Sequence, residues 1–166
     1  ISEIIKQSTK ILFVYTFITF ILFLIYKIIN FRSFDAFNLA MTVISSGGFL
    51  IVNNISEILQ SNYQVYVFSL SMLVSFFGIL LPYNIILLKK KDLLVFTEDF
   101  YLLLYFIFLL AIFFIFFNQH NSFSITLFSL ITSISNIGFS FNDFNNNNFI
   151  YFILVIIGGS LVSTSS

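Results

Sequence analysis

The sequence predicts an all-α polytopic membrane protein built from two helix–pore loop–helix repeats, with the last helix interrupted and truncated. Three observations carry this prediction: the composition, a series of long apolar runs, and an arrangement of segments that occurs twice. Hydrophobic residues make up 59% of the 166 residues and charged residues 8%, whereas soluble domains carry about 25% charged residues. A soluble domain of this length has too little interior to cover so much apolar surface, so membrane lipid is the expected surrounding.

Net charge and cysteine content argue against several other classes of protein. The formal net charge is zero and Lys and Arg form no broad stripe, which argues against nucleic-acid binding because phosphates require a basic footprint. The sequence contains no Cys, which excludes disulfides and thiolate metal sites. The single histidine, His120, lies among polar residues, so we expect a solvated loop residue there rather than a metal ligand.

Long apolar runs give the expected membrane-crossing helices. Such a helix needs roughly 20 apolar residues. Three runs come close to or exceed that length, at about 11–29, 63–88 and 100–117. A fourth run begins at 149 and is interrupted by Gly158 and Gly159, so we expect a broken helix there.

Two shorter segments lie between the long runs and are too short to cross a bilayer. They cover about 33–45 and 122–135, and we expect them to be the pore helices of re-entrant loops. Each is followed by Gly-Phe, at Gly48 and Gly138, and then by a polar loop. The two copies lie about 90 residues apart, and internal repeats recur in membrane transport proteins. The first repeat therefore covers 1–91 and the second covers 92–166.

Helical periodicity supports the two short helices. In the first, an apolar stripe is formed by Phe34, Phe37, Ala40, Met41 and Ile44. In the second, the stripe is formed by Leu127, Phe128, Ile131 and Ile134. Apolar residues at intervals of three and four indicate an amphipathic helix.

The distribution of basic residues predicts the orientation. Lys89–Lys91 form the strongest basic cluster, and Lys6 and Lys10 precede the first run; the positive-inside rule places both groups in the cytoplasm. The short segments then enter from the external face and return to it. Asp35, Glu57 and Asp143 fall on that external side, where they would concentrate cations or act as ordinary solvated loop charges.

A short helix followed by an extended, glycine-containing segment is suited to a cation pore. Non-helical backbone at membrane depth survives only where it is buried in protein or lines water. The C-terminal end of the helix carries partial negative charge, and the carbonyl groups that follow can replace the hydration shell of an ion. The alternative is two buried helix–turn segments with glycines at ordinary C-caps, and the spacing alone leaves both interpretations open.

Three motifs resemble one known family. Ser-Phe-Asp-Ala-Phe at 33–37 and Thr-Val-Ile-Ser-Ser-Gly-Gly-Phe at 42–49 resemble the second repeat of the Trk/Ktr/HKT potassium transporters. Ile-Thr-Ser-Ile-Ser-Asn-Ile-Gly-Phe-Ser at 131–140 resembles the third-repeat filter of their TrkH-like membrane subunit. Gly-Gly-Ser at 158–160, followed by Ser163 and Thr164, resembles the segment that interrupts the next helix. The chain then corresponds to a fragment covering the second and third repeats.

The resemblance implies which residues form the pore. The selectivity filter would use the backbone carbonyl groups of Ser46, Gly47, Gly48, Asn136, Ile137 and Gly138. A gate loop below it would contain Gly158, Gly159, Ser160, Ser163 and Thr164. Asn136 departs from the usual Thr or Ser, which leaves the ion preference open. Close helix–helix packing through small residues is the other interpretation of Gly158 and Gly159.

The implied function is potassium uptake by a four-repeat, multi-pass transporter of the inner (plasma) membrane. Potassium is the substrate, no covalently bound cofactor is expected, and the chain is not expected to be an enzyme. The resemblance also implies a homodimer of the full-length protein and a cytoplasmic nucleotide-binding regulatory subunit. A less selective K+/Na+ channel and a non-transporting membrane scaffold or sensor remain as alternatives. A membrane enzyme is disfavoured because Lys27 is the only charged residue in the long runs, and catalysis there needs ionisable groups.

Overall fold

The computed structural model describes residues 2–76, 100–101, 103–111, 123–140 and 155–156. Within these residues the chain is helical and contains no strand, so the all-α prediction is confirmed for them. The helices are α1 (Ser2–Ile28), α2 (Ser33–Ser45), the short 3-10 helix η1 (Ile55–Glu57), α3 (Asn62–Phe76) and α6 (Phe123–Ile134). Residues 103–111 are also helical. Helices α2 and α6 occupy the ranges in which the two short helices were expected.

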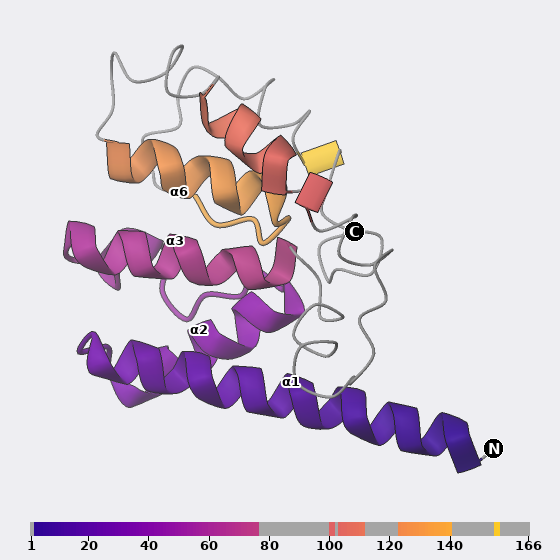
Figure 1. Ribbon diagram of the computed structural model, residues 1–166. Coiled ribbons are helices and arrows are strands. Elements are labelled where there is room, and N and C mark those ends of the chain that lie inside the picture. Colours follow the sequence, from indigo (N-terminus) through magenta and orange to yellow (C-terminus); the bar gives the residue numbers. More distant parts are fainter. Residues whose placement is uncertain (1, 77–99, 102, 112–122, 141–154, 157–166) are drawn as a thin grey trace.

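The helices form a stack in which α3 is central (Figure 1). Helix α1 packs on α2, α2 packs on α3, and α3 packs on α6. The two short helices therefore lie on either side of α3. The N-terminal part of α1 extends beyond the other helices.

From Ile11 to Ile28, helix α1 carries large apolar side chains on all of its faces. Its buried positions recur every four residues, at Val14, Ile18, Leu22 and Tyr26. The remaining faces are exposed and equally apolar, with large side chains at Ile11, Leu12, Phe13, Phe17, Phe20, Ile21, Leu24 and Ile28. A helix that is hydrophobic all round belongs inside a large core or in a membrane, and little of α1 is covered by protein here.

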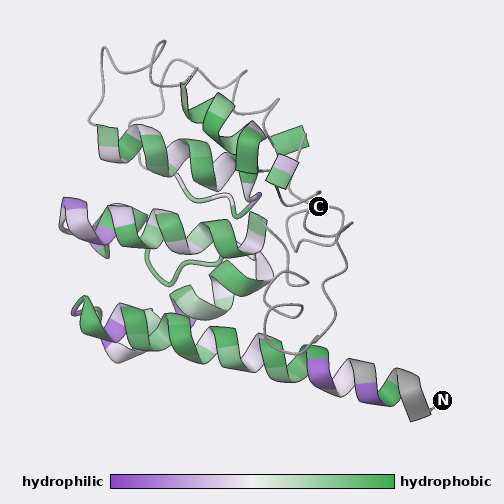
Figure 2. Cartoon of the chain, in the orientation of Figure 1, coloured by the Kyte–Doolittle hydropathy of each residue, from purple (hydrophilic) through white to green (hydrophobic). Residues whose placement is uncertain are grey.

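The segment Ser8–Ile28 of α1 is long and apolar enough to cross a bilayer, and it is the one helix of that kind among the described residues. The helix begins earlier than the run expected at 11–29, because Ser2–Lys10 continues the same helix as a polar extension. Figure 2 shows hydrophobic residues along the lengths of the helices, with hydrophilic residues mostly near helix ends. Of the expected runs at 63–88 and 100–117, the structure describes only residues 63–76, 100–101 and 103–111.

Helices α3 and α6, which pack on one another, bury many small hydroxyl side chains. The buried ones are Ser69, Ser71, Ser75, Ser124, Thr126, Ser129, Thr132 and Ser133. Several donate to a carbonyl group of their own helix, as Ser69 Oγ does to Val65 O at 2.6 Å. Small residues let helices approach closely, which is typical of packing in membranes.

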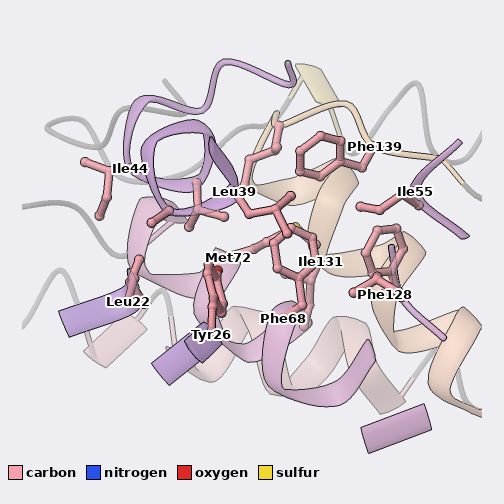
Figure 3. Packing of buried hydrophobic residues seen from close by; sticks show 14 of the residues in the cluster. Leu22, Tyr26, Leu39, Ile44, Ile55, Phe68, Met72, Phe128, Ile131 and Phe139 are labelled. Atoms are coloured by element: carbon pink, nitrogen blue, oxygen red, sulfur yellow. The ribbon is translucent and has the colours of Figure 1, made fainter. Parts of the chain in front are cut away.

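Phe68 of α3 holds the centre of the core (Figure 3). Its ring lies 5.8 Å from that of Tyr26 on α1 and 6.2 Å from that of Phe128 on α6. Tyr26 also shares a buried hydrogen bond with Ser71 of α3. One aromatic side chain thus connects three helices and, as described below, the segment that follows α6.

The buried face of α2 differs in part from the apolar stripe in the sequence. Ala40 and Ile44 are buried, but Phe34, Phe37 and Met41 are exposed. Their exposure has a physical reason: the opposite side of α2, which includes Leu39 and Val43, makes the helix contacts. An apolar stripe in a membrane protein can face lipid as readily as protein, so periodicity does not choose between them.

Candidate functional site

The segment after α2, residues 46–49, is called here the first loop. Helix α2 ends at Ser45, and Ser46 adopts a left-handed conformation with φ 49°. Ser46 N donates to Val43 O at 3.4 Å and Gly47 N donates to Thr42 O at 3.1 Å. These two bonds form a Schellman motif, which satisfies carbonyl groups at the end of a helix. Gly48 then adopts a second left-handed conformation, with φ +65°.

The segment after α6, residues 136–139, is the second loop and has left-handed residues at the same two positions as the first. Asn136 is left-handed with φ 54°, and Gly138 is left-handed with φ 83°. Asn136 N donates to Ser133 O at 3.4 Å, as Ser46 does to Val43 in the first loop. Both loops therefore place a non-glycine residue and a glycine, two positions apart, in left-handed backbone conformations.

The backbone conformation of Asn136 was not predicted from the sequence. Asn is the residue other than glycine that adopts the left-handed region most readily. Its position directly after the last turn of α6 is the signal that would have identified it, because Asn is common at such C-caps. The departure from Thr or Ser at this position therefore has a backbone explanation.

The two loops touch one another. A Cβ atom on Gly48 would lie only 2.2 Å from the carbonyl oxygen of Ile137, closer than any side chain allows. The first loop can thus approach the second only with glycine at position 48. The contact brings the two predicted groups of filter residues together, although about 90 residues separate them in the chain.

Gly138 has a different surrounding from Gly48. A Cβ atom on Gly138 would have no neighbouring atom within 4 Å among the described residues, so this glycine borders a space that none of these residues fills. Gly47 is less crowded than Gly48 and more crowded than Gly138. A Cβ atom on Gly47 would lie 2.9 Å from Ser45 Oγ and 3.1 Å from the ring of Phe49.

The phenylalanines that end the two loops lie in different surroundings. Phe139 is 3% exposed and its ring lies 5.7 Å from that of Phe68, so it anchors the second loop on α3. Phe49 is 79% exposed. Within the described residues Phe139 therefore wedges its loop into protein, whereas Phe49 does not. The reason is that no described helix covers the ring of Phe49.

Threonine side chains connect both loops to their helices. Thr42 Oγ1 donates to Phe49 O at 3.0 Å, and Phe139 N donates to Thr132 Oγ1 at 3.0 Å. Both threonines are buried. From the sequence, Thr42 and Thr132 were identified only as members of the two motifs, without a role of their own.

Several loop carbonyl groups point away from their own helices. In a trans peptide the C=O and the following N–H point in opposite directions, and the described residues contain no cis peptide. Gly47 N–H points at Thr42, so the Ser46 carbonyl points away from the end of α2. Phe139 N–H points at Thr132, so the Gly138 carbonyl points away from α6.

Charged groups lie near the start of α2. Arg32 Nε donates to Asp35 Oδ2 at 2.7 Å and Arg32 Nη2 donates to Asp35 Oδ1 at 3.3 Å. This hydrogen bond and the carboxylate charge raise the pKa of the Arg32 guanidinium above its usual value. Arg32, Asp35 and the exposed Glu57 border a hollow of about 300 Å³. Asp35 was expected either to concentrate cations or to be a solvated loop charge. It is instead buried, and its charge is offset by Arg32.

The candidate gate residues lie outside the described residues: Gly158, Gly159, Ser160, Ser163 and Thr164. His120 and the cluster Lys89–Lys91 lie outside them as well. All six candidate filter residues are described, and they occupy the two loops.

Comparisons with known proteins add no family to these observations. The chain matched no family model, no curated protein and no solved structure.

Proposed function

We propose that this chain forms part of a multi-pass protein of the inner membrane that takes up potassium through a pore lined by backbone carbonyl groups. The two loops, residues 46–49 and 136–139, supply two of the segments around that pore. The protein is a four-repeat transporter similar to the Trk/Ktr/HKT family, of which this chain contains two repeats.

The observation that carries the proposal is the contact between Gly48 and the Ile137 carbonyl. Two loops that follow two short helices meet in space, and each begins with the same turn. A filter made of several re-entrant segments requires this convergence, because an ion must be surrounded by carbonyl groups from more than one loop. Two unrelated helix–turn segments with ordinary C-caps have no reason to bring a glycine of one against a backbone carbonyl of the other.

The chemistry of the loops suits a monovalent cation. Neither loop contains a charged side chain, so its ligands are carbonyl oxygens and the partial negative charge at the ends of α2 and α6. Such groups replace the hydration shell of an ion without holding it too tightly to leave. The carbonyl groups of Ser46 and Gly138, which point away from their own helices, are the first candidates for this role.

A membrane setting is supported by α1 and by the interface of α3 and α6. Helix α1 presents large apolar side chains on every face, and the two packed helices bury small hydroxyl residues. We extend the proposal to the remaining predictions: a homodimer, a nucleotide-binding regulatory subunit in the cytoplasm, and a gate at residues 158–164.

Two other functions compete with potassium uptake. A less selective K+/Na+ channel is favoured by the open space beside Gly138, because a loosely enclosed ion is less well discriminated. A scaffold or sensor without transport would need the glycines for folding alone.

The test is Rb+ and Na+ uptake by the full-length protein in cells that lack their own potassium uptake. Wild type is compared with Gly48→Ser and Gly138→Ser at equal membrane levels. We expect wild type to take up Rb+ and both substitutions to lower the Rb+/Na+ ratio, with Gly48→Ser also lowering total uptake because it displaces the Ile137 carbonyl.

The matched control is Asn30→Ser. Asn30 is also left-handed, with φ 70°, but it follows α1 and is not part of either loop. It therefore reports the effect of backbone strain without a change in the loops, and its Rb+/Na+ ratio should equal that of wild type. Two results would contradict the proposed pore and support a scaffold. One is a wild type that takes up no Rb+, and the other is a Rb+/Na+ ratio in both glycine variants equal to that of Asn30→Ser.

A further inference from the structure

We infer that Thr42 and Thr132 are positioning residues that orient the peptide groups of the two loops and so set ion discrimination. The inference rests on the proposed pore and assigns a role to two side chains outside the predicted filter. It begins from two hydrogen bonds. Each joins a buried threonine hydroxyl to the backbone of the phenylalanine seven residues later, at 3.0 Å.

These two threonines differ from others in the described part of the chain. Thr9, Thr16 and Thr19 donate to carbonyl groups three or four residues earlier in their own helix, which is α1. Such bonds are common for threonine in helices and position nothing outside the helix. Thr42 and Thr132 instead bond forward, across the turn, to the phenylalanine that ends each loop.

The two bonds have opposite polarity. Thr42 acts as a donor to the Phe49 carbonyl, whereas Thr132 acts as an acceptor from the Phe139 N–H group. A hydroxyl oxygen can serve in either way, as a donor or as an acceptor. Thr42 thus holds Phe49 through the peptide group that follows it. Thr132 holds Phe139 through the peptide group that precedes it.

This difference decides which carbonyl groups are available to an ion. Thr42 turns the Phe49 carbonyl toward α2 and occupies it. Thr132 holds the Phe139 N–H, so the Gly138 carbonyl in the same planar peptide points the other way, on the loop whose glycine borders open space. Loss of the Thr132 hydroxyl would allow that peptide to rotate and would remove the carbonyl from its position.

The experiment replaces each hydroxyl in the full-length protein. Thr42→Val and Thr132→Val keep the branched shape and remove the hydroxyl, while Thr42→Ser and Thr132→Ser keep the hydroxyl and remove the methyl group. Thr19→Val is the matched control, since the Thr19 hydroxyl bonds only Tyr15 O of its own helix. The readouts are the Rb+/Na+ uptake ratio at equal membrane level and hydrogen–deuterium exchange of residues 136–140 in the purified protein.

We expect each valine variant to lower the Rb+/Na+ ratio by about fivefold, the factor that corresponds to one typical hydrogen bond. The serine variants and Thr19→Val should keep the wild-type ratio. The Phe139 amide should exchange slowly in wild type and in Thr132→Ser, and at least tenfold faster in Thr132→Val.

Three results overturn the inference. The first is a valine variant with a wild-type ratio, and the second is a serine variant as impaired as the valine variant. The third is fast exchange of the Phe139 amide in wild type, which decides the matter even where Thr132→Val does not fold. A wild type with slow exchange of the Phe139 amide but no Rb+ uptake would instead contradict the proposed pore, while the hydrogen bond between Thr132 and Phe139 would stand.

Discussion

The first and second loops have the same turn but opposite surroundings. In the first, Gly48 is pressed against the Ile137 carbonyl and Phe49 is exposed. In the second, Gly138 borders open space and Phe139 is buried against Phe68. The first loop is therefore fixed through its glycine, and the second through its phenylalanine.

This difference shows that similar motifs need not be equally sensitive at equivalent positions. Local sequence determines the turn, because the left-handed residues and the cap bonds depend on neighbours within the loop. How the helices pack determines which residue of each loop contacts the rest of the protein: Gly48 in the first loop and Phe139 in the second. Substitutions at matched positions separate these two contributions.

The largest contrast is expected at the phenylalanines. Phe139→Ala removes a buried ring and should lower the free energy of unfolding by about 3–5 kcal/mol, whereas Phe49→Ala should change it by less than about 0.5 kcal/mol. Thermal unfolding of both variants of the full-length protein in detergent measures the difference. Equal losses would mean that Phe49 is covered by protein outside the described residues.

A smaller contrast is expected at the glycines. Gly138→Ala adds left-handed strain of about 1–2 kcal/mol. Gly48→Ala adds the same strain and a collision with the Ile137 carbonyl, for a total of about 2–4 kcal/mol. The same unfolding measurement applies, and a Gly138→Ala variant that is the less stable of the two would contradict the contact seen at Gly48.

The smallest difference in stability is expected when the residue types at positions 46 and 136, the non-glycine left-handed positions, are exchanged. Ser46→Asn introduces the side chain better suited to the left-handed region and should stabilise the protein by less than about 1 kcal/mol. Asn136→Ser should destabilise it by a similar amount. Changes of the same sign in both variants would show that hydrogen bonds of these side chains outweigh their backbone preference.

Much of the local structure could be predicted from the sequence. The short helix expected at 33–45 is α2, and that at 122–135 is α6 with one residue fewer at each end. Helical periodicity and the following Gly-Phe were sufficient here, because both are local signals. Composition likewise predicted helices and the apolar circumference of α1.

The contacts of the site could not be predicted in the same way. Nothing local indicates that Gly48 meets Ile137, because that contact depends on how α2, α3 and α6 pack. The exposure of Phe34, Phe37 and Phe49 has the same origin, since an aromatic residue in a membrane protein is stable against lipid or protein. The direct ion pair of Arg32 with Asp35 was not predicted either, because the sequence was taken to place Asp35 in solvent, whereas the fold buries it.

The contact between Gly48 and Ile137 has a consequence for biosynthesis. The first loop leaves the ribosome about 90 residues before its partner, which corresponds to roughly 5–20 seconds at usual synthesis rates of about 5–20 residues per second. During that time the turn after α2 exists without the carbonyl group against which it will rest. The packing of the first loop is therefore completed only when the second loop arrives. Until then the Schellman turn and the Thr42 hydroxyl satisfy its backbone groups.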